Sequence, residues 1–329
     1  MSLLEVVELR KLYPLRKPSV LRRLGGAETP QIHALDGVSF AIAPGEALGL
    51  VGESGCGKST LAALVARLDD PSSGAIRFEG HDIAAVPARR AARAPWRASL
   101  QMVFQDPHDS LDPRRTIAEA IAAPLRRLKG LNGDAVASRV AWALDRVHLG
   151  AAFADRLPHR LSGGQLARAA LARAIALEPK LLILDEPTSA LDVSVQAAIL
   201  KLLDELRRDL GLATLFVSHD LDVVRMICQR VLVMYLGRIV EEGPAEAVFN
   251  RPAHPYTARL IAAVPRLGAK ARELGAAPTG EARSPIDLRA SLCAFEGLCP
   301  NASPRCRRER PTLERGDEDR AVACFLPLR

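Results

Sequence analysis

Five short apolar runs within the first 250 positions have the length and composition of β-strands, and they cover residues 38–42, 47–51, 100–104, 181–184 and 214–217. Between them, apolar residues recur at helical spacing, as in 134–149 and 195–210. This alternation of strands and helices predicts a three-layer α/β domain built on a largely parallel sheet. Helical spacing between the third and fourth strands indicates an inserted helical lobe. From about 268 to 290, the chain turns to Ala, Gly, Pro and charge without a sustained period, which predicts a linker.

A glycine-rich stretch, GESGCGKST at 52–60, follows the apolar run 47–51 and precedes the helical pattern 58–68. Gly52, Gly57, Lys58 and Ser59 fit the pattern G-x-x-x-x-G-K-[ST]. In such a loop the backbone wraps phosphates, the lysine reaches the β- and γ-phosphates, and the serine hydroxyl ligates Mg²⁺. The strand, loop and helix context therefore predicts a nucleotide site.

Two carboxylates end the apolar run 181–184, and a histidine follows the run 214–217. A charge at the tip of a buried strand is costly unless it binds a cation or takes part in a reaction. Asp185 is therefore predicted to hold Mg²⁺, and Glu186 to act as the general base. A helix-capping acid before Pro187 is the structural alternative. His219 falls at the carboxyl edge of the sheet, where ligands of parallel sheets bind.

Composition narrows the class of protein. The chain has 329 residues, a net charge of +7 and 48% hydrophobic content, enough for one large core plus an appendage. Only 4% of residues are aromatic, and the sequence has no platform of aromatic residues on which bases could stack. The composition therefore does not indicate direct nucleic-acid binding. No run reaches the roughly 18 apolar residues of a membrane helix, and Glu5 and Glu8 stand where a signal peptide would be apolar. These features predict a soluble, cytosolic protein.

Six motifs in order carry a family resemblance: GESGCGKST, VFQDP, LSGGQ, LLILDEP, SALD and SHD. With them, residues 1–265 resemble the nucleotide-binding subunits of ATP-binding cassette (ABC) transporters. The resemblance implies a P-loop NTPase fold with a RecA-like core, an antiparallel β subdomain and a helical lobe at about 106–176. It implies ATP and Mg²⁺ as cofactors, with 266–290 as linker and 291–329 as a four-cysteine extension.

The resemblance also assigns roles to individual residues. It implies that the LSGGQ loop closes over ATP held by a second subunit in a head-to-tail dimer, which accounts for two anion-binding loops in one domain. Gln105 is implied to sense Mg²⁺ and water while contacting the membrane subunits. Tyr13 is implied to stack on adenine, with an ordinary strand-edge tyrosine as the alternative. The implied catalytic residues are Glu186, His219, Lys58 and Gln105, and the implied Mg²⁺ residues are Ser59, Gln105 and Asp185. The implied nucleotide contacts are Tyr13, Gly52, Glu53, Ser54, Gly55, Cys56, Gly57, Lys58, Ser59, Thr60, Ser162, Gly163, Gly164, Gln165 and Asp192.

One departure from the family pattern follows the LSGGQ loop. Leu166 and Ala167 stand where the family usually has polar or basic residues, which puts local dimer contacts in doubt.

The segments VFQDPHDSLDPR, LDVSVQAAIL and 233–267, with the cysteine-bearing tail, are similar to the ATPases of dipeptide and oligopeptide importers. That likeness implies a second, paralogous ATPase subunit, two membrane permeases and an extracytoplasmic solute-binding protein. It places the chain at the cytoplasmic face of the cytoplasmic membrane. Nickel and glutathione remain alternative cargoes. A non-transport ABC ATPase acting on nucleic acid or the ribosome, and a nucleotide switch without turnover, are the alternatives of other classes.

Four of the six cysteines, Cys293, Cys299, Cys306 and Cys324, fall in the last 37 residues, with five, six and seventeen residues between them. Disulfides are not expected in a reducing cytosol. The irregular spacing favours a [4Fe-4S] cluster over zinc, with free thiols as the third possibility. Cys56 lies before a helix N-terminus and beside Lys58, and this setting predicts a lowered thiol pKa.

Overall fold

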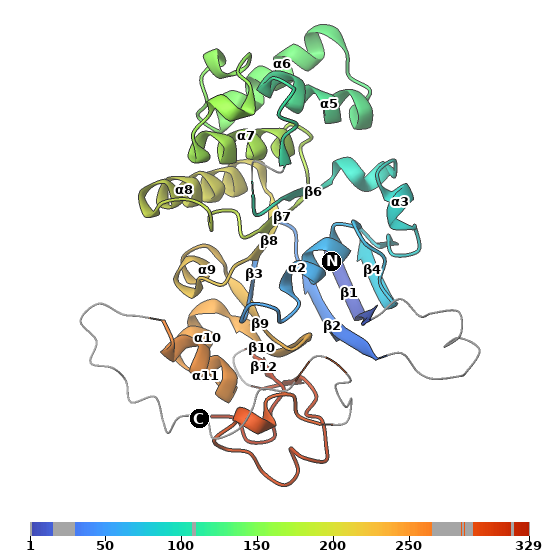
Figure 1. Cartoon of the computed structure of the whole chain (residues 1–329), viewed down its shortest axis with the longest axis vertical. Helices are drawn as coiled ribbons and strands as arrows, with labels where there is room; N and C mark the ends of the chain where they lie inside the picture. The colour runs from blue at the N-terminus through green and yellow to red at the C-terminus, as the bar shows by residue number, and fades with distance from the viewer. Residues whose placement is uncertain are drawn as a thin grey trace.

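The computed structural model describes residues 2–15, 30–106, 110–264, 284, 286, 292–316 and 319–328 (Figure 1). The predicted linker 266–290 lies outside the described residues except for positions 284 and 286. All the elements below belong to the described part.

The larger sheet has eight strands in the order β11-β12-β10-β9-β3-β8-β7-β6. Neighbouring strands from β9 to β6 run parallel, and those from β9 to β11 run antiparallel. Every residue of β3, β7 and β8 is buried, which explains why these strands read as continuous apolar runs. The bounds are β3 Ala47–Val51, β6 Leu100–Val103, β7 Leu181–Asp185, β8 Ala213–Val217, β9 Arg230–Tyr235, β10 Arg238–Pro244, β11 Glu314–Arg315 and β12 Ala321–Val322. Four of the five predicted strands lie here, within one residue of their predicted bounds.

The fifth predicted strand, 38–42, belongs to a separate antiparallel sheet rather than to the parallel one. That sheet has the order β2-β1-β4-β5, with bounds β1 Leu4–Pro14, β2 Gln31–Ile42, β4 Ser73–Phe78 and β5 His81–Asp82. From Val38 to Ile42, buried and half-buried residues alternate along β2, because only one face of this sheet is covered. A five-residue apolar run does not by itself distinguish the two situations.

The helices lie around the larger sheet, and α5, α6 and α7 pack on one another at the top of Figure 1. Their bounds are α2 Lys58–Val65, α3 Ala88–Ala91, α5 Ile117–Lys129, α6 Gly133–Arg146, α7 Gly163–Ile175, α8 Val193–Leu210, α9 Leu221–Ile227, α10 Ala245–Asn250 and α11 Pro255–Ala262. Short 3₁₀ turns are η1 Pro95–Ala98, η2 Ala151–Phe153, η3 Pro158–Arg160 and η4 Glu296–Leu298.

Two of these helices end earlier than their apolar pattern predicts. Helix α2 ends at Val65, and Arg67 just beyond it has φ 52°. Helix α6 ends at Arg146, and His148 has φ 55°. A left-handed residue cannot continue a right-handed helix. Val147 and Leu149 are buried beyond the end of α6, whereas Leu68 beyond α2 is 45% exposed.

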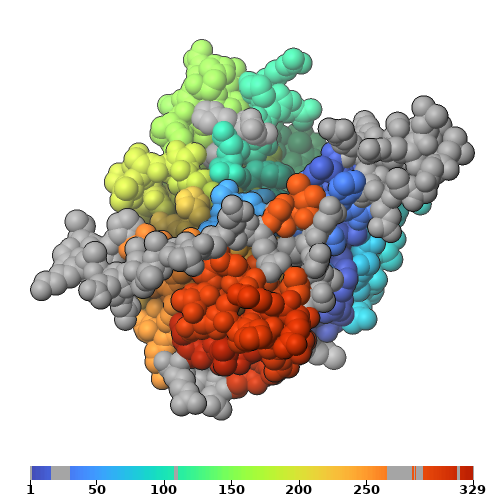
Figure 2. All heavy atoms as spheres, turned by 60° about the horizontal axis from the view of Figure 1, so that its bottom comes forward, coloured from blue at the N-terminus to red at the C-terminus, as the bar shows by residue number. Residues whose placement is uncertain are grey.

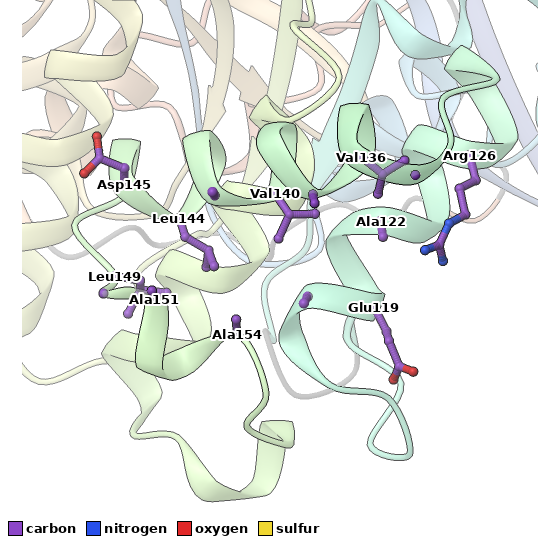
Figure 3. A pocket seen from close by; sticks show the side chains of 15 residues that line it. Glu119, Ala122, Arg126, Val136, Val140, Leu144, Asp145, Leu149, Ala151 and Ala154 are labelled. Atoms are coloured by element: carbon purple, nitrogen blue, oxygen red, sulfur yellow. The ribbon is translucent and has the colours of Figure 1, made fainter.

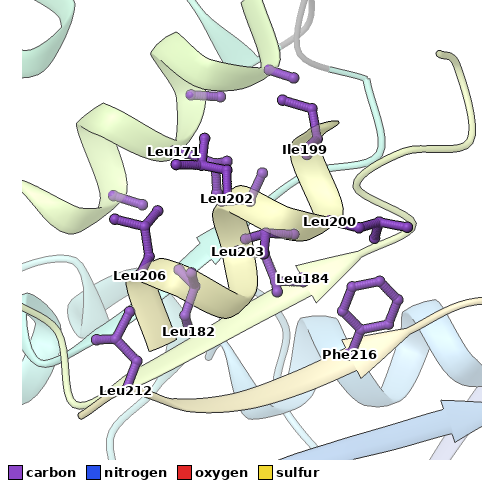
Figure 4. Close-up of a cluster of buried hydrophobic side chains, with 14 of the residues drawn as sticks. Leu171, Leu182, Leu184, Ile199, Leu200, Leu202, Leu203, Leu206, Leu212 and Phe216 are labelled. Carbon is purple, nitrogen blue, oxygen red and sulfur yellow. The ribbon is translucent and has the colours of Figure 1, made fainter. Parts of the chain in front are cut away.

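The core lies on both faces of the larger sheet. Leu182 and Leu184 of β7 join one buried cluster, whereas Leu181 and Ile183 join the other. Figure 4 shows the first face, where leucines of α8 lie over Leu182, Leu184 and Phe216. Helix α8 therefore covers the face of the sheet that carries Leu182 and Leu184.

The described part of the tail packs against the open end of the larger sheet. Strand β12 pairs with β10, and β11 pairs with β12, so the tail adds two short strands to the sheet edge. Residues 292–316 and 319–328 form one continuous mass, coloured red in Figure 2. The tail is therefore built onto the same sheet that carries the glycine-rich loop.

Candidate nucleotide-binding site

The glycine-rich loop connects β3 to α2, and its backbone requires glycine at two positions. Gly57 caps α2 with φ 108°, and a Cβ there would lie 2.4 Å from the Ala34 carbonyl oxygen. At Gly52 a Cβ would lie 2.2 Å from the Met234 carbonyl oxygen. The loop therefore fits against β2 and β9 only without side chains, and it directs the N-terminus of α2 at the site.

Lys58 is held inside this loop. Its side-chain nitrogen donates to the carbonyl oxygens of Gly52 at 2.8 Å and Glu53 at 2.9 Å. The residue is only 5% exposed. These two contacts hold the lysine side chain against the loop that is predicted to bind phosphate.

An open cavity lies at the carboxyl ends of β3, β6, β7 and β8. Its lining includes nine residues of the predicted site: Ser54, Gly55, Gly57, Lys58, Ser59, Thr60, Gln105, Glu186 and His219. It also includes five that the motifs did not indicate: Ile32, His33, Ala34, Leu236 and Gly237. Those five come from β2 and the β9–β10 turn, and no local sequence signal marks them because the tertiary fold alone brings them to the loop.

Asp185 is not among the lining residues, but it faces Ser59, which lines this cavity. The Ser59 Oγ donates to the Asp185 Oδ1 at 3.3 Å. Burial raises the pKa of the Asp185 carboxyl, the charge of Glu186 raises it further, and Ser59 and Lys58 oppose the rise. A buried carboxylate and a hydroxyl at this spacing fit Mg²⁺, which takes few protein ligands and completes its shell with phosphates and water.

Glu186 sits at the centre of a polar group. Its Oε2 lies 3.2 Å from the His219 Nδ1 and accepts from the Gln105 Nε2 at 3.3 Å. Its backbone has φ 46°, and its N–H donates to the Val217 carbonyl at 2.9 Å. A non-glycine residue in this conformation is strained, and such strain is concentrated at functional sites.

Tyr13 lies beside the site without lining the cavity. Its hydroxyl donates to the Asp69 carboxylate at 2.9 Å, and the Lys11 Nζ lies 4.9 Å from the ring centroid. Burial and the Asp69 contact raise the pKa of Tyr13 to about 12. Its stacking on adenine stays a prediction.

The LSGGQ loop is not among the residues that line this cavity. Ser162 caps α7 in a reciprocal arrangement with Gln165, and both Ser162 and Gly163 are exposed. At Gly164, a Cβ would lie 2.5 Å from the Val195 Cγ1 of α8. Asp192 caps α8, where it accepts from the Val195 N–H. This second loop is thus formed and exposed, and it is available to another molecule.

The departure from the family pattern after LSGGQ has a structural explanation. Leu166 is fully buried and Ala167 is 3% exposed, so both face the interior from α7. The departure therefore falls on buried positions of α7 and not on the exposed loop residues Ser162 and Gly163.

The predicted lowering of the Cys56 thiol pKa was wrong. The thiol belongs to a buried core cluster, is 4% exposed and does not line the cavity. Burial raises the pKa of Cys56, and the opposing charge of Lys58, with its Nζ 4.0 Å from the sulfur, does not overcome it. Desolvation therefore outweighs the favourable charge, because the side chain points away from the helix N-terminus and into the core.

The four tail cysteines come together around one small cavity, which His254 and Phe295 also line. All four are free thiols, and burial raises the pKa of Cys293, Cys299 and Cys324. Among the residues that the structure describes, no three His, Cys, Asp or Glu side chains are arranged to hold a metal ion. The structure thus gathers the predicted cysteines and gives no ligand geometry for the predicted cluster or for zinc.

A glycine-rich phosphate loop, a carboxylate pair and a histidine at the carboxyl edge of a parallel sheet define a P-loop NTPase. In the described part, no helix is long and apolar enough to cross a membrane. Two family models match the chain: "ABC transporter" over residues 35–189, and "Oligopeptide/dipeptide transporter, C-terminal region" over 240–306. The second match covers the start of the cysteine-bearing tail.

Known proteins agree with both matches. A probable peptide ABC transporter ATP-binding protein of Sinorhizobium fredii is 46% identical over 99% of this chain and 90% of its own length. The dipeptide transport ATP-binding protein of Haemophilus influenzae is 42% identical over 98% of this chain and 96% of its own. A dimeric post-hydrolysis structure of the ATP-binding cassette MJ0796 with ADP and Pi matches at a TM-score of 0.63 and 28% identity, covering 74% of this chain and 98% of that one. The chain belongs to the ATP-binding subunits of peptide ABC transporters.

Proposed function

We propose that this chain is the ATP-hydrolysing subunit that energises the import of dipeptides and oligopeptides through a multi-subunit ABC importer. The observation that carries the proposal is the match to peptide-transport ATPases over nearly the whole chain, tail included, and it is supported by the cavity that gathers nine of the predicted site residues. The test is uptake of a labelled dipeptide by cells that carry the complete system, with Lys58→Ala in this chain as the inactive control. Uptake of labelled glutathione or nickel in place of the peptide would redirect the cargo assignment.

In this proposal, each residue around the cavity has a separate role in ATP hydrolysis. Glu186 accepts a proton from the attacking water, and His219 and Gln105 hold the carboxylate in position through the contacts described above. Lys58 turns from its loop carbonyls to the β- and γ-phosphates. The backbone of residues 52–60 wraps the phosphates.

Ser59 and Asp185 would hold Mg²⁺, with Gln105 at its edge. The ion would neutralise charge on the phosphate oxygens. Burial raises the pKa of Asp185. The charge of a cation beside this carboxyl would oppose the rise by favouring the ionised carboxylate.

The exposed LSGGQ loop is proposed to complete the site of a second, paralogous ATPase subunit. Its exposure, its separation from this chain's own cavity and the dimeric form of the related cassette MJ0796 support a head-to-tail dimer. Ser162, Gly163, Gly164 and Gln165 would contact the partner's nucleotide, with Asp192 beside them at the interface.

An apolar groove between α5 and α6 is proposed as the docking site of a membrane permease. Ala122, Val136, Val140 and Leu144 form its apolar part, with Glu119 and Arg126 among the charged residues (Figure 3). Gln105 of the ATP site comes shortly before α5 in the chain, so the groove lies near that site in sequence. We assign the groove to an amphipathic segment of the permease.

Two groove positions and one outside it give a matched test of this docking. Ala137 and Ala141 are exposed residues that line the groove, whereas Ser138 is exposed and does not line it. Ala137→Glu and Ala141→Glu should lose copurification with the two permeases while keeping ATP binding. Ser138→Glu should keep both. Equal copurification of all three variants would remove the groove from this role.

With two permeases and an extracytoplasmic solute-binding protein completing the importer, the chain would lie peripherally at the cytoplasmic face of the cytoplasmic membrane. Residues 1–265 would act as the ATPase domain and 291–329 as the extension. The helical lobe at about 106–176 would carry the permease contact.

We also propose that the tail cysteines hold a [4Fe-4S] cluster, with zinc as the alternative. Support comes from the convergence of Cys293, Cys299, Cys306 and Cys324 on one cavity, since four sulfur donors from one short segment suit either metal group. The four thiols would have to lose their protons to bind it, because the thiolate is the metal ligand. A cluster would add thiolate bonds that staple the tail.

Metal analysis of the anaerobically purified chain decides between these outcomes. A cluster predicts brown protein with about four iron and four sulfide per chain, and Cys299→Ser should bleach it while nucleotide binding persists. Stoichiometric zinc in colourless protein would reject the cluster. Neither metal would leave four free thiols.

A further inference from the structure

One contact links the phosphate loop to a residue about two hundred positions later. The buried Tyr256, on α11, accepts a hydrogen bond on its hydroxyl from the Glu53 N–H at 2.9 Å. The carbonyl of the same Glu53 accepts from the Lys58 Nζ at 2.9 Å. Glu53 is therefore held by Tyr256 on its N–H and by Lys58 on its carbonyl.

These two contacts differ in what nucleotide binding would do to them. Lys58 has to leave the loop carbonyls to reach phosphates, because its ammonium cannot serve both at full strength. Tyr256 lies on a helix outside the cavity lining, so bound phosphate would not compete with the Glu53 N–H for its hydroxyl. It is thus the contact that keeps the loop in shape when the lysine turns away.

Tyr256 is itself positioned by the tail. Its ring lies 4.5 Å from that of Tyr235 and 5.5 Å from that of Phe295, which sits between two tail cysteines. Tyr235 and Phe295 also meet edge to face at 5.3 Å. Such aromatic contacts restrict the ring to one orientation, and that orientation places the hydroxyl against the loop.

The start of α11 is fastened to the tail as well. The His254 Nδ1 caps the helix by accepting from the Tyr256 N–H at 3.0 Å. Glu241, fully buried, accepts from the His254 N–H at 2.9 Å and from the tail residue Arg320 at 2.6 Å. The tail, the helix start and the phosphate loop are therefore joined by direct contacts.

We propose that Tyr256 is a positioning residue of the phosphate loop and that Phe295 makes the tail part of the same support. The inference rests on the proposed binding of ATP by residues 52–60, and it holds whether or not the tail carries a metal. It gives the tail a role in nucleotide affinity.

The variant that tests this is Tyr256→Phe, which keeps the ring and removes the hydroxyl. The neighbouring Thr257→Val is its matched control, since Thr257 is fully buried and its hydroxyl has no hydrogen-bond partner among the described residues. Losing one net hydrogen bond should raise the Kd for MgATP about 3- to 10-fold. Within the assembled transporter, the KM for ATP should rise and kcat at saturating ATP should stay within about twofold, because the catalytic groups are untouched.

Hydrogen exchange supplies a second readout. Amide exchange in peptides that cover residues 47–58 should speed up in Tyr256→Phe and, less strongly, in Phe295→Leu, while α8 exchanges as before. If Tyr256→Phe does not fold, Phe295→Leu carries the test through the same two measurements.

Two results would overturn the proposal. One is a Tyr256→Phe variant that matches Thr257→Val in both Kd and loop exchange, which would make Tyr256 a packing residue only. The other is loss of kcat with an unchanged Kd. Failure of the underlying ATP-binding assignment looks different, because then Lys58→Ala would still bind MgATP like the wild type.

Discussion

Replacement of Glu186 by Gln should separate nucleotide binding from hydrolysis. The amide keeps the shape of the side chain and its contacts to the Gln105 Nε2 at 3.3 Å and the His219 Nδ1 at 3.2 Å, with one of the two weakened at most. A weakened neutral hydrogen bond costs about 0.5 kcal/mol, so the Kd for MgATP should change by only about twofold. Loss of the general base should lower the hydrolysis rate by about 10² to 10⁴, or about 3 to 5 kcal/mol of barrier.

The neighbouring Asp185 sharpens the expectation. The negative charge of Glu186 adds to the burial that raises the pKa of Asp185, so its removal should favour the ionised Asp185 and leave Mg²⁺ binding intact. ATP-bound dimers should then accumulate. The assay is ATP turnover by the assembled complex, with the catalytic glutamate of the partner ATPase also replaced so that its site is silent. Turnover near the wild-type rate in that complex would refute the role of Glu186.

Three further predictions concern stability and labelling. Asp36→Ala should lower the free energy of unfolding in urea by about 3 to 5 kcal/mol, because it leaves the Arg238 guanidinium buried without the Asp36 carboxylate. That guanidinium is only 7% exposed and lies 2.6 Å from the carboxylate. A loss under about 1 kcal/mol would contradict this, and the double variant with Arg238→Met should recover part of the lost stability. Asp185→Asn should be more stable than the wild type without nucleotide at neutral pH. Burial raises the folded-state pKa of Asp185, so the wild type loses stability relative to this variant as pH rises above 3.8, and a difference independent of pH would show that the carboxyl does not titrate abnormally. Alkylation of Cys56 should be slow, since burial raises its thiol pKa, and labelling as fast as for a free cysteine peptide would show that the loop opens.

The local chemistry of the site could be predicted from the sequence because it follows from short-range patterns. The order of glycines, lysine and serine at 52–60, between a strand and a helix, predicts a loop that can offer its N–H groups to an anion. Likewise, a fully apolar run that ends in two carboxylates marks both a buried strand and the edge where Asp185 and Glu186 meet the loop.

Contacts between distant segments were decided only by the tertiary structure. No pattern near Glu53 indicates that its N–H meets Tyr256, and none near Cys56 shows that the thiol turns into the core. The run 38–42 has strand character in either sheet, and its pairing with β1 settles which one it joins. The physical reason is that periodicity reports which face of an element is buried, whereas the partner that buries it comes from a part of the chain far away in sequence.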